Sequence, residues 1–179
     1  MKRLFVIILL SLIMTSSFSQ RRPPRDYLIT YTDVEGLNAS SLGLSFYSYP
    51  DNNNRTKWMF PMVISVNVLT LRPSYFEKLN YESAKLNYYM PGISAFRKIN
   101  NYFWLNLGLQ IPIGSEEVKD YYGNKFDTFL IGLVPTEGIF FIPQSDVGFT
   151  FSVGLYQELM TSIVYNVDIG LKAEIGIKF

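Results

Sequence analysis

The final fifteen residues alternate without interruption between apolar side chains and polar or small ones. Every second position of residues 165–179 is apolar, and the positions between them are polar, charged or glycine. Because successive side chains of a β-strand point to opposite faces, this period of two predicts one long strand with an apolar and a polar face. A membrane-crossing strand needs about nine to eleven residues, whereas most strands of globular proteins have about five or six. The segment is therefore long enough to cross a bilayer.

The same alternation predicts further strands upstream. It is regular in residues 103–114 and 147–156. Less regular candidates lie at residues 41–49, 59–71, 86–96, 126–134 and 138–142, separated by polar or turn-forming stretches such as 51–54, 135–138 and 143–146. Together these segments make about eight strands. Residues 27–34 alternate weakly, so ten strands also fit the pattern, because bacterial single-chain barrels have an even number.

The N-terminal residues predict export. Lys2 and Arg3 precede an apolar run of about eleven residues, and small residues follow, with Ser19 at the expected cleavage position. The run is too short for a transmembrane helix, which needs about twenty residues. We therefore expect a cleaved signal peptide over residues 1–19. The arginines and prolines of residues 20–26 predict a flexible leader, and residues 27–179 are short enough to form a single domain.

Two missing residue types exclude most chemistry. The chain contains no cysteine and no histidine, which removes disulfides, thiolate metal sites, lipid-modified cysteines and catalytic triads of the Ser-His-Asp kind. It also lacks a P-loop and a G-x-S-x-G elbow, and Asp127, Glu137, Asp146 and Glu158 are more simply loop or lumen charges than paired catalytic carboxylates. The formal net charge is +1, without a long basic run. We expect no enzymatic activity, no cofactor, no metal and no nucleic-acid partner.

Three features favour a membrane barrel with its apolar face outside. Glycines lie on the polar face, where the backbone of a narrow barrel must curve, and that face carries charges of both signs. Aromatic residues gather near the expected strand ends, where rings suit the head-group layer; they are Tyr47, Tyr49, Trp58, Phe60, Tyr88, Tyr89, Tyr102, Phe103, Tyr121 and Tyr122. The predicted fold is an all-β, antiparallel, up-and-down transmembrane barrel. An eight-stranded barrel is narrow enough for side chains to fill it. The expected lumen residues are Trp104, Asn106, Gln110, Tyr156, Asp168, Lys172, Glu174 and Lys178.

The last seven residues carry a family resemblance. Ala173-Glu174-Ile175-Gly176-Ile177-Lys178-Phe179 resembles the assembly signal of Gram-negative outer-membrane β-barrel proteins, whose last strand ends in an aromatic residue. The matching positions are Leu171, Ala173, Ile175, Ile177 and Phe179. The resemblance implies an outer-membrane location, contact with outer-membrane lipid and recognition by the barrel-assembly machinery. It does not identify a subfamily, and the short predicted loops count against an adhesin that binds through its loops.

These observations predict a non-catalytic barrel with a structural or interaction role. Two alternatives remain. A soluble, lipocalin-like periplasmic carrier would turn the apolar face inward, with Phe103, Leu105, Phe149 and Phe151 around an apolar ligand. A narrow channel would keep the membrane arrangement but leave an open lumen. Solubility without detergent distinguishes the carrier, and conductance distinguishes the channel.

Overall fold

The structure is a computed structural model that describes residues 25–50, 57–72 and 81–179. The predicted signal peptide lies outside these residues, as does most of the predicted leader, whereas Arg25 and Asp26 already belong to the first strand. The strands are β1 (Arg25–Gly36), β2 (Ala39–Pro50), β3 (Trp58–Met59), β4 (Met62–Leu71), β5 (Tyr81–Lys98), β6 (Phe103–Gln110), β7 (Ile113–Asp120), β8 (Lys125–Phe141), β9 (Gly148–Met160) and β10 (Val167–Lys178). In the described part of the chain, no helix is long and apolar enough to cross a membrane.

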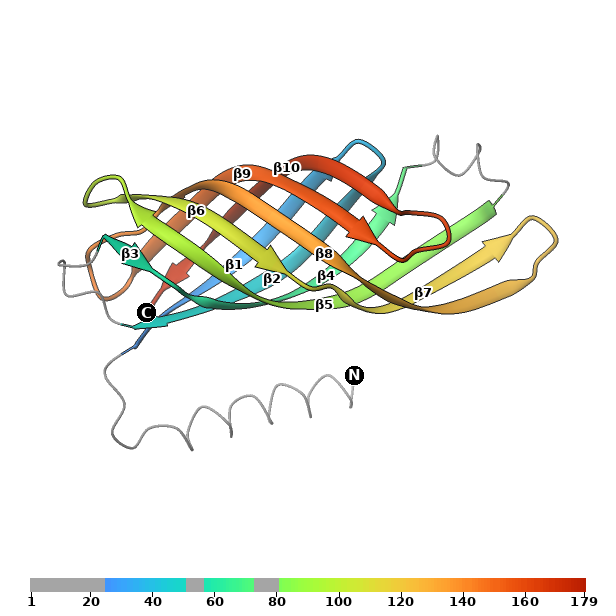
Figure 1. Ribbon diagram of the computed structural model, residues 1–179, viewed down its shortest axis with the longest axis horizontal. Coiled ribbons are helices and arrows are strands. Elements are labelled where there is room, and N and C mark those ends of the chain that lie inside the picture. Colours follow the sequence, from blue (N-terminus) through green and yellow to red (C-terminus); the bar gives the residue numbers. More distant parts are fainter. Residues whose placement is uncertain (1–24, 51–56, 73–80) are drawn as a thin grey trace, which may run out of the picture.

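Ten strand segments form eight barrel strands. β3 and β4 both pair with β5 and make one interrupted strand, and β6 and β7 make another between β5 and β8. Pro61 and Pro112 lie in these interruptions. Because proline has no N–H to donate to a neighbouring strand, the pairing breaks at these positions. All pairs are antiparallel, and β1 pairs with both β2 and β10, which closes the sheet (Figure 1). The predicted fold class is confirmed.

The predicted strand count is right, but two of the predicted boundaries are wrong. Residues 27–34, which alternate weakly, lie within the full-length strand β1. Conversely, the segments 126–134 and 138–142 are one strand, because β8 continues through Pro135 and no turn forms at 135–138. Pro135 lies where the pairing of β8 with β9 skips residues 134 and 135, so the ladder to β9 is interrupted at the proline while the pairing with β6 continues.

Within the barrel wall, burial alternates along the strands in the membrane sense. On β4, Ile64 and Val66 point outward with 52% and 57% of their surface exposed, whereas Ser65 between them is 1% exposed. A soluble barrel that carries an apolar ligand has the opposite arrangement, so the carrier alternative is wrong. Glycines on the inner face allow close strand contact. A Cβ at Gly154 would lie 2.8 Å from the Cα of Gly138 on the neighbouring strand.

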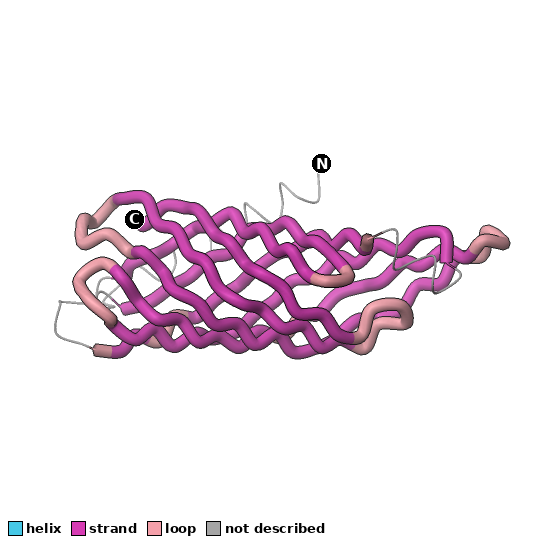
Figure 2. The backbone as a smooth tube through the Cα atoms, turned by 90° about the horizontal axis from the view of Figure 1, so that it is seen from above, coloured by secondary structure: helices cyan, strands magenta, loops and turns pink. Residues whose placement is uncertain are grey.

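Apolar clusters fill both ends of the lumen. At the end near the chain termini, hereafter the termini end, the cluster contains Leu28, Tyr47, Met59, Val63, Phe96, Trp104, Phe140 and Ile142. The cluster at the opposite end is larger and contains, among others, Val34, Ala39, Leu71, Leu86, Val118, Val164 and Tyr165. Beyond that opposite end, parts of β5, β7 and β8 continue as a three-stranded extension (Figures 1 and 2). We call residues 81–88, 113–120 and 125–131 the ribbon.

Tyr165 does not follow the prediction. The sequence pattern makes it the first outward residue of the last strand, but β10 begins at Val167 and the side chain of Tyr165 is completely buried. The reason is that residues 161–166 form a connection that folds over the mouth of the barrel. There the phenol of Tyr165 has polar partners inside the lumen, which the lipid face would not provide.

Candidate functional site

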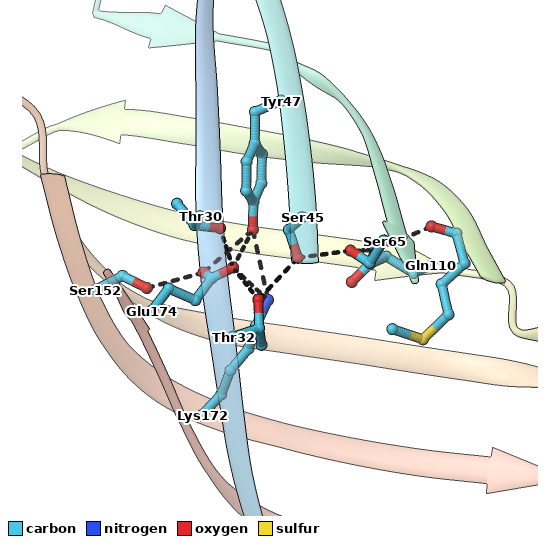
Figure 3. Close-up of polar contacts among 10 residues, drawn as sticks. Thr30, Thr32, Ser45, Tyr47, Ser65, Gln110, Ser152, Lys172 and Glu174 are labelled. Atoms are coloured by element: carbon cyan, nitrogen blue, oxygen red, sulfur yellow. Dashed lines mark hydrogen bonds and ion pairs between the residues drawn. The ribbon is translucent and has the colours of Figure 1, made fainter. Parts of the chain in front are cut away.

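A buried carboxylate lies at the centre of the lumen. Glu174 on β10 is 4% exposed and forms an ion pair with Lys172 at 3.2 Å. Its two oxygens also accept hydrogen bonds from the hydroxyls of Thr30, Thr32, Tyr47 and Ser152, at 2.9–3.2 Å (Figure 3). These donors come from β1, β2 and β9. A carboxylate with this many donors and one cation is fully compensated, so it holds neighbouring strands together instead of acting as an exposed acid.

A chain of hydroxyls extends from this carboxylate to the other side of the barrel. Neighbouring members of the chain are 2.8–3.2 Å apart, in the order Gln110, Ser65, Ser45, Thr32 and Glu174 (Figure 3). Each hydroxyl has one proton, and the carboxylate can only accept. Every bond must therefore point the same way, from the Gln110 amide toward Glu174. Aligned hydrogen bonds of this kind polarise and strengthen one another.

A second carboxylate cluster lies nearer the ribbon end. The Tyr165 hydroxyl lies 2.8 Å from Glu158 and 3.0 Å from Asp168, and the Tyr156 hydroxyl lies 3.2 Å from Glu158. Asp168 also accepts the backbone N–H groups of residues 37, 38 and 39 at 3.0–3.3 Å, so it caps the turn between β1 and β2. Glycine is required at Gly36, because a Cβ there would lie 2.8 Å from the Asp168 Cγ.

The connection between β9 and β10 closes the mouth of the barrel. Glu116 on β7 is buried and accepts hydrogen bonds from the Ser162 hydroxyl and from the backbone N–H of Ile163. This attachment holds Val164 and Tyr165 inside the lumen. The remaining central cavity has a volume of about 10 Å³, which is enough for about one water molecule. The described residues therefore fill the barrel and leave no open passage through it.

All eight predicted lumen residues are buried inside the barrel. The structure brings them into separate places: Lys172 and Glu174 in the central cluster, Tyr156 and Asp168 in the second, and Lys178 in an ion pair with Asp26 at 2.9 Å. Trp104 lies in the apolar cluster at the termini end, with the Lys98 ammonium 5.9 Å from its ring centroid. Gln110 starts the hydroxyl chain, and the Asn106 Oδ1 has no hydrogen-bond partner among the described residues.

Sequence reasoning missed four important lumen residues. Glu116 lies beyond the predicted end of its strand at residue 114, and Tyr165 was assigned to the outer face. Tyr47 and Tyr88 were expected among the head-group aromatics, but both are buried. The sequence pattern could have placed Tyr47 inside the barrel, because Tyr47 lies at the same alternate positions of the strand as Ser41 and Ser45, which are on the inner face of β2. Among the described residues, no group of three or more acidic side chains could hold a metal ion.

On the ribbon, β8 has an edge that no described strand pairs with. β8 pairs with β7 along residues 125–131, but its pairing with β9 begins only at Gly132. Thr161 satisfies both backbone groups of Ile131 on this side of β8. Its N–H donates to the Ile131 carbonyl at 2.8 Å, and its hydroxyl accepts the Ile131 N–H at 3.1 Å. Because backbone groups alternate sides along a strand, those of Asp127 and Phe129 point to the same side as those of Ile131. No described strand lies beside them, so we call residues 125–130 the open edge.

The ribbon reverses the face pattern of the barrel. Toward its tip the outward residues are charged, with ion pairs from Lys119 to Glu82 at 2.6 Å and from Lys125 to Glu117 at 3.0 Å, whereas nearer the barrel the same face carries Phe129 and Ile131. Most residues of the opposite face are apolar, namely Ala84, Leu86, Val118, Phe126 and Leu130, and that face also carries Glu116 and Thr128. Charged outward residues and unpaired backbone groups are unfavourable in hydrocarbon, so we expect the tip of the ribbon to lie in water. The hydrogen bond to Glu117 raises the pKa of Lys125, consistent with a stable surface pair.

The tip of the ribbon is a tight turn with two exposed tyrosines. Asp120 accepts hydrogen bonds from the backbone N–H of Tyr122 at 2.9 Å and from the backbone and side chain of Asn124 at 2.8 Å. The Asn124 side-chain bond is the main cause that lowers the pKa of Asp120. Gly123 has a φ of 85°, a conformation that glycine adopts without strain. Tyr121 and Tyr122 project from this turn, and Tyr122 is 92% exposed.

Solved structures with the same fold come from the outer membranes of Gram-negative bacteria. Ail, the attachment invasion locus protein of Yersinia pestis, matches 87% of this chain and 96% of its own length, with a TM-score of 0.52 and 15% identity. Neisserial surface protein A matches 86% and 94% (TM-score 0.49, 14% identity), and the N-terminal β-barrel domain of Pseudomonas aeruginosa OprF matches 86% and 97% (TM-score 0.49, 7% identity). No protein-family model and no curated protein match the sequence. The likeness to Ail, an outer membrane protein, establishes the fold and agrees with the C-terminal resemblance.

Proposed function

We propose that this chain is an integral outer-membrane barrel with a non-catalytic interaction role, and that it binds an extended segment of a partner polypeptide at the open edge of β8. The observation that carries this proposal is the row of unpaired backbone groups at residues 125–130. Unpaired strand edges bind further strands readily, and proteins normally cover or blunt them. Here the edge lies on a ribbon outside the bilayer, where a partner can reach it.

The chemistry of the edge defines the partner segment. A strand that pairs antiparallel with β8 would exchange backbone hydrogen bonds with Asp127 and Phe129. About six residues, or roughly 20 Å of extended chain, would fit along the edge. Alternate side chains of the segment would lie on the apolar face beside Phe126, which is exposed, whereas Leu130 on the same face is buried. The others would lie on the charged face, where a basic residue would complement Asp127. The exposed Tyr121 and Tyr122 are well placed at the tip to add contact area.

The filled lumen supports a role without transport or catalysis. The central carboxylate is compensated by one cation and four hydroxyls, and apolar clusters fill both ends of the barrel. Such an interior stabilises the barrel but offers no route for a solute. We therefore expect purified protein in planar bilayers to show no steady conductance. A reproducible unitary current would contradict this expectation and favour the channel alternative.

The C-terminal strand supports the predicted assembly role. Phe179 and Tyr27 exchange two backbone hydrogen bonds of 2.9 Å, and their rings lie 5.9 Å apart, so the terminal residue is part of the seam between β1 and β10. Leu171, Ile175 and Ile177 point outward and are exposed to lipid on the same strand. We infer that Leu171, Ala173, Ile175, Ile177 and Phe179 form a surface that the barrel-assembly machinery recognises before the seam closes.

Hydrogen exchange with a synthetic strand tests the interaction role. The probe is an eight-residue peptide that alternates valine with threonine and carries one lysine, designed to lie opposite Asp127. We expect the amides of Asp127 and Phe129 to exchange quickly in the free barrel and to become protected when the peptide is added. A Phe129→Pro variant removes one edge donor and should weaken binding at least tenfold, whereas Lys119→Gln, on the middle strand of the ribbon and away from the edge backbone, should not. Protection that is absent, or that survives in Phe129→Pro, would contradict the proposal.

A further inference from the structure

At the termini end, the outer surface carries a group of cations and aromatic rings away from the ribbon. Trp58 and Phe60 are exposed and stack with their ring centroids 6.3 Å apart and their planes 6° apart. The Arg97 guanidinium lies over the Trp58 ring, 5.7 Å from its centroid. Lys57 is exposed and directly precedes Trp58, and its backbone is fixed beside this group because its carbonyl accepts the N–H of Lys98 at 2.9 Å. We call Lys57, Trp58, Phe60 and Arg97 the basic aromatic patch.

Neither cation of this patch forms an ion pair with a described acidic residue. Lys125, Lys119, Arg72, Lys172 and Lys178 form ion pairs with carboxylates, whereas Arg97 and Lys57, like Lys85 and Lys98, form none with any described residue. Trp58 and Arg97 are directly opposite each other on β3 and β5, so strand pairing holds the ring and the guanidinium side by side. Within the described part of the chain, the patch therefore has a net charge of about +2 and no anion of its own.

The position of the patch identifies the kind of anion. Along the same outer faces the next residues are apolar, with Met62 and Ile93 both more than 60% exposed. These residues belong to the surface that contacts hydrocarbon, so Trp58 and Arg97 lie at the level of the lipid head groups. At that level the abundant anion is the phosphate of a phospholipid. Arginine binds phosphate through two parallel N–H donors, and an aromatic platform can cover the glycerol and upper acyl carbons of the same lipid.

We propose that the basic aromatic patch is a binding site for the head group of an anionic phospholipid, with Arg97 and Lys57 on the phosphate and Trp58 and Phe60 against the glycerol region. The site would hold one lipid at a fixed place on the barrel wall. It is separate from the open edge of β8, because the two lie at opposite ends of the barrel (Figure 1).

Tryptophan quenching provides a direct test, because one of the two tryptophans lies in the patch. Trp58 is on the outer surface, and Trp104 is buried in the lumen, so a Trp58→Phe variant measures the background. The barrel is reconstituted in vesicles of equal parts phosphatidylcholine and phosphatidylglycerol, and bromine is placed either on the choline lipid or on the glycerol lipid. Membrane composition and surface potential are then identical in the two samples, and any difference in quenching reports which lipid lies beside Trp58.

We expect brominated phosphatidylglycerol to quench Trp58 more strongly, with an affinity ratio of roughly fivefold for each cation engaged. Arg97→Gln should lower the ratio by about fivefold, and Arg97→Gln with Lys57→Gln should bring it close to one. Arg97→Lys should retain most of the preference, and Arg72→Gln, at the ribbon end, should retain all of it. A heat-dependent shift in gel mobility checks that each variant is folded.

Three outcomes would overturn the proposal. Equal quenching by the two lipids in the wild-type barrel would mean that the patch has no preference. A preference that persists after both Gln substitutions would mean that these cations do not bind the lipid. Loss of the preference in inorganic phosphate, but not in sodium chloride of the same ionic strength, would show a site for free phosphate instead of a lipid.

Discussion

Removing one partner of the central ion pair should destabilise the barrel strongly. In a Lys172→Met variant, Glu174 keeps its four hydroxyl donors but loses the only cation within 4 Å that the structure provides, at 3.2 Å. Coulomb's law with an effective dielectric constant of about 20 gives an attraction of roughly 5 kcal/mol at this distance. Removing one partner of a buried pair typically costs about 3–5 kcal/mol. Since the hydroxyls still stabilise the carboxylate, we expect a loss near the lower limit, about 3 kcal/mol.

The assay is reversible urea unfolding in phospholipid vesicles, followed by tryptophan fluorescence. Glu174→Gln should also destabilise the barrel, and the double variant Lys172→Met with Glu174→Gln should lose less than the sum of the single losses by about 2 kcal/mol. The surface pair Lys125 and Glu117 is the matched control, with side chains 64% and 52% exposed against 10% and 1% for the buried pair. The corresponding substitutions there should leave the unfolding midpoint unchanged. Additive losses at the central pair, or a Lys172→Met loss below about 0.5 kcal/mol, would refute the reasoning.

Three further substitutions or conditions have clear expected outcomes. Phe179→Ser should reduce the amount of heat-modifiable barrel in outer-membrane fractions, and normal membrane levels would show that the terminal aromatic residue is dispensable. Gly36→Ala should lower the unfolding free energy by roughly 1–3 kcal/mol, because its Cβ meets the Asp168 carboxylate, and unchanged stability in urea would mean that the turn adjusts freely. Because the pKa of Asp120 is lowered from its usual 3.8, its contribution to the tip is present above that value and is lost as pH falls through the lower, folded pKa. Amide chemical shifts of Tyr122 and Asn124 should report this transition, and a midpoint above 3.8 would contradict it.

The sequence predicts the direction of side chains better than it predicts their partners. Trp104, Asn106 and Lys172 could be assigned to the interior because the period of two is a local property of each strand. The hydrogen-bond partners of Glu174 could not be predicted, because Thr30 and Tyr47 are more than 120 residues away in the chain and meet Glu174 only when β1 closes against β10. Closure of a barrel depends on register, which no single segment encodes.

The ribbon was missed for a different physical reason. Outside the bilayer the outward face no longer needs apolar residues, so the alternation of residues 103–114 fades after Gly114 although the strand pairing continues to Asp120. The turn at 121–124 is shorter than the predicted connection between residues 114 and 126. Short loops do not reveal that the paired strands extend beyond the barrel and hold this turn at their end. A surface for partners therefore arises from strands and not from long loops.

The change of face pattern at the base of the ribbon also determines how deeply the barrel is immersed. One row of outward residues across the three strands, Tyr89, Ile113 and Ile131, is apolar, and two rows higher Lys85, Glu117 and Asp127 are all charged. Each row advances about 7 Å along a strand. Sinking by two rows, about 14 Å, would press the charged row toward hydrocarbon, and rising would expose the apolar row to water. The two rows thus limit the vertical movement of the barrel, and with it the height of the open edge above the membrane surface.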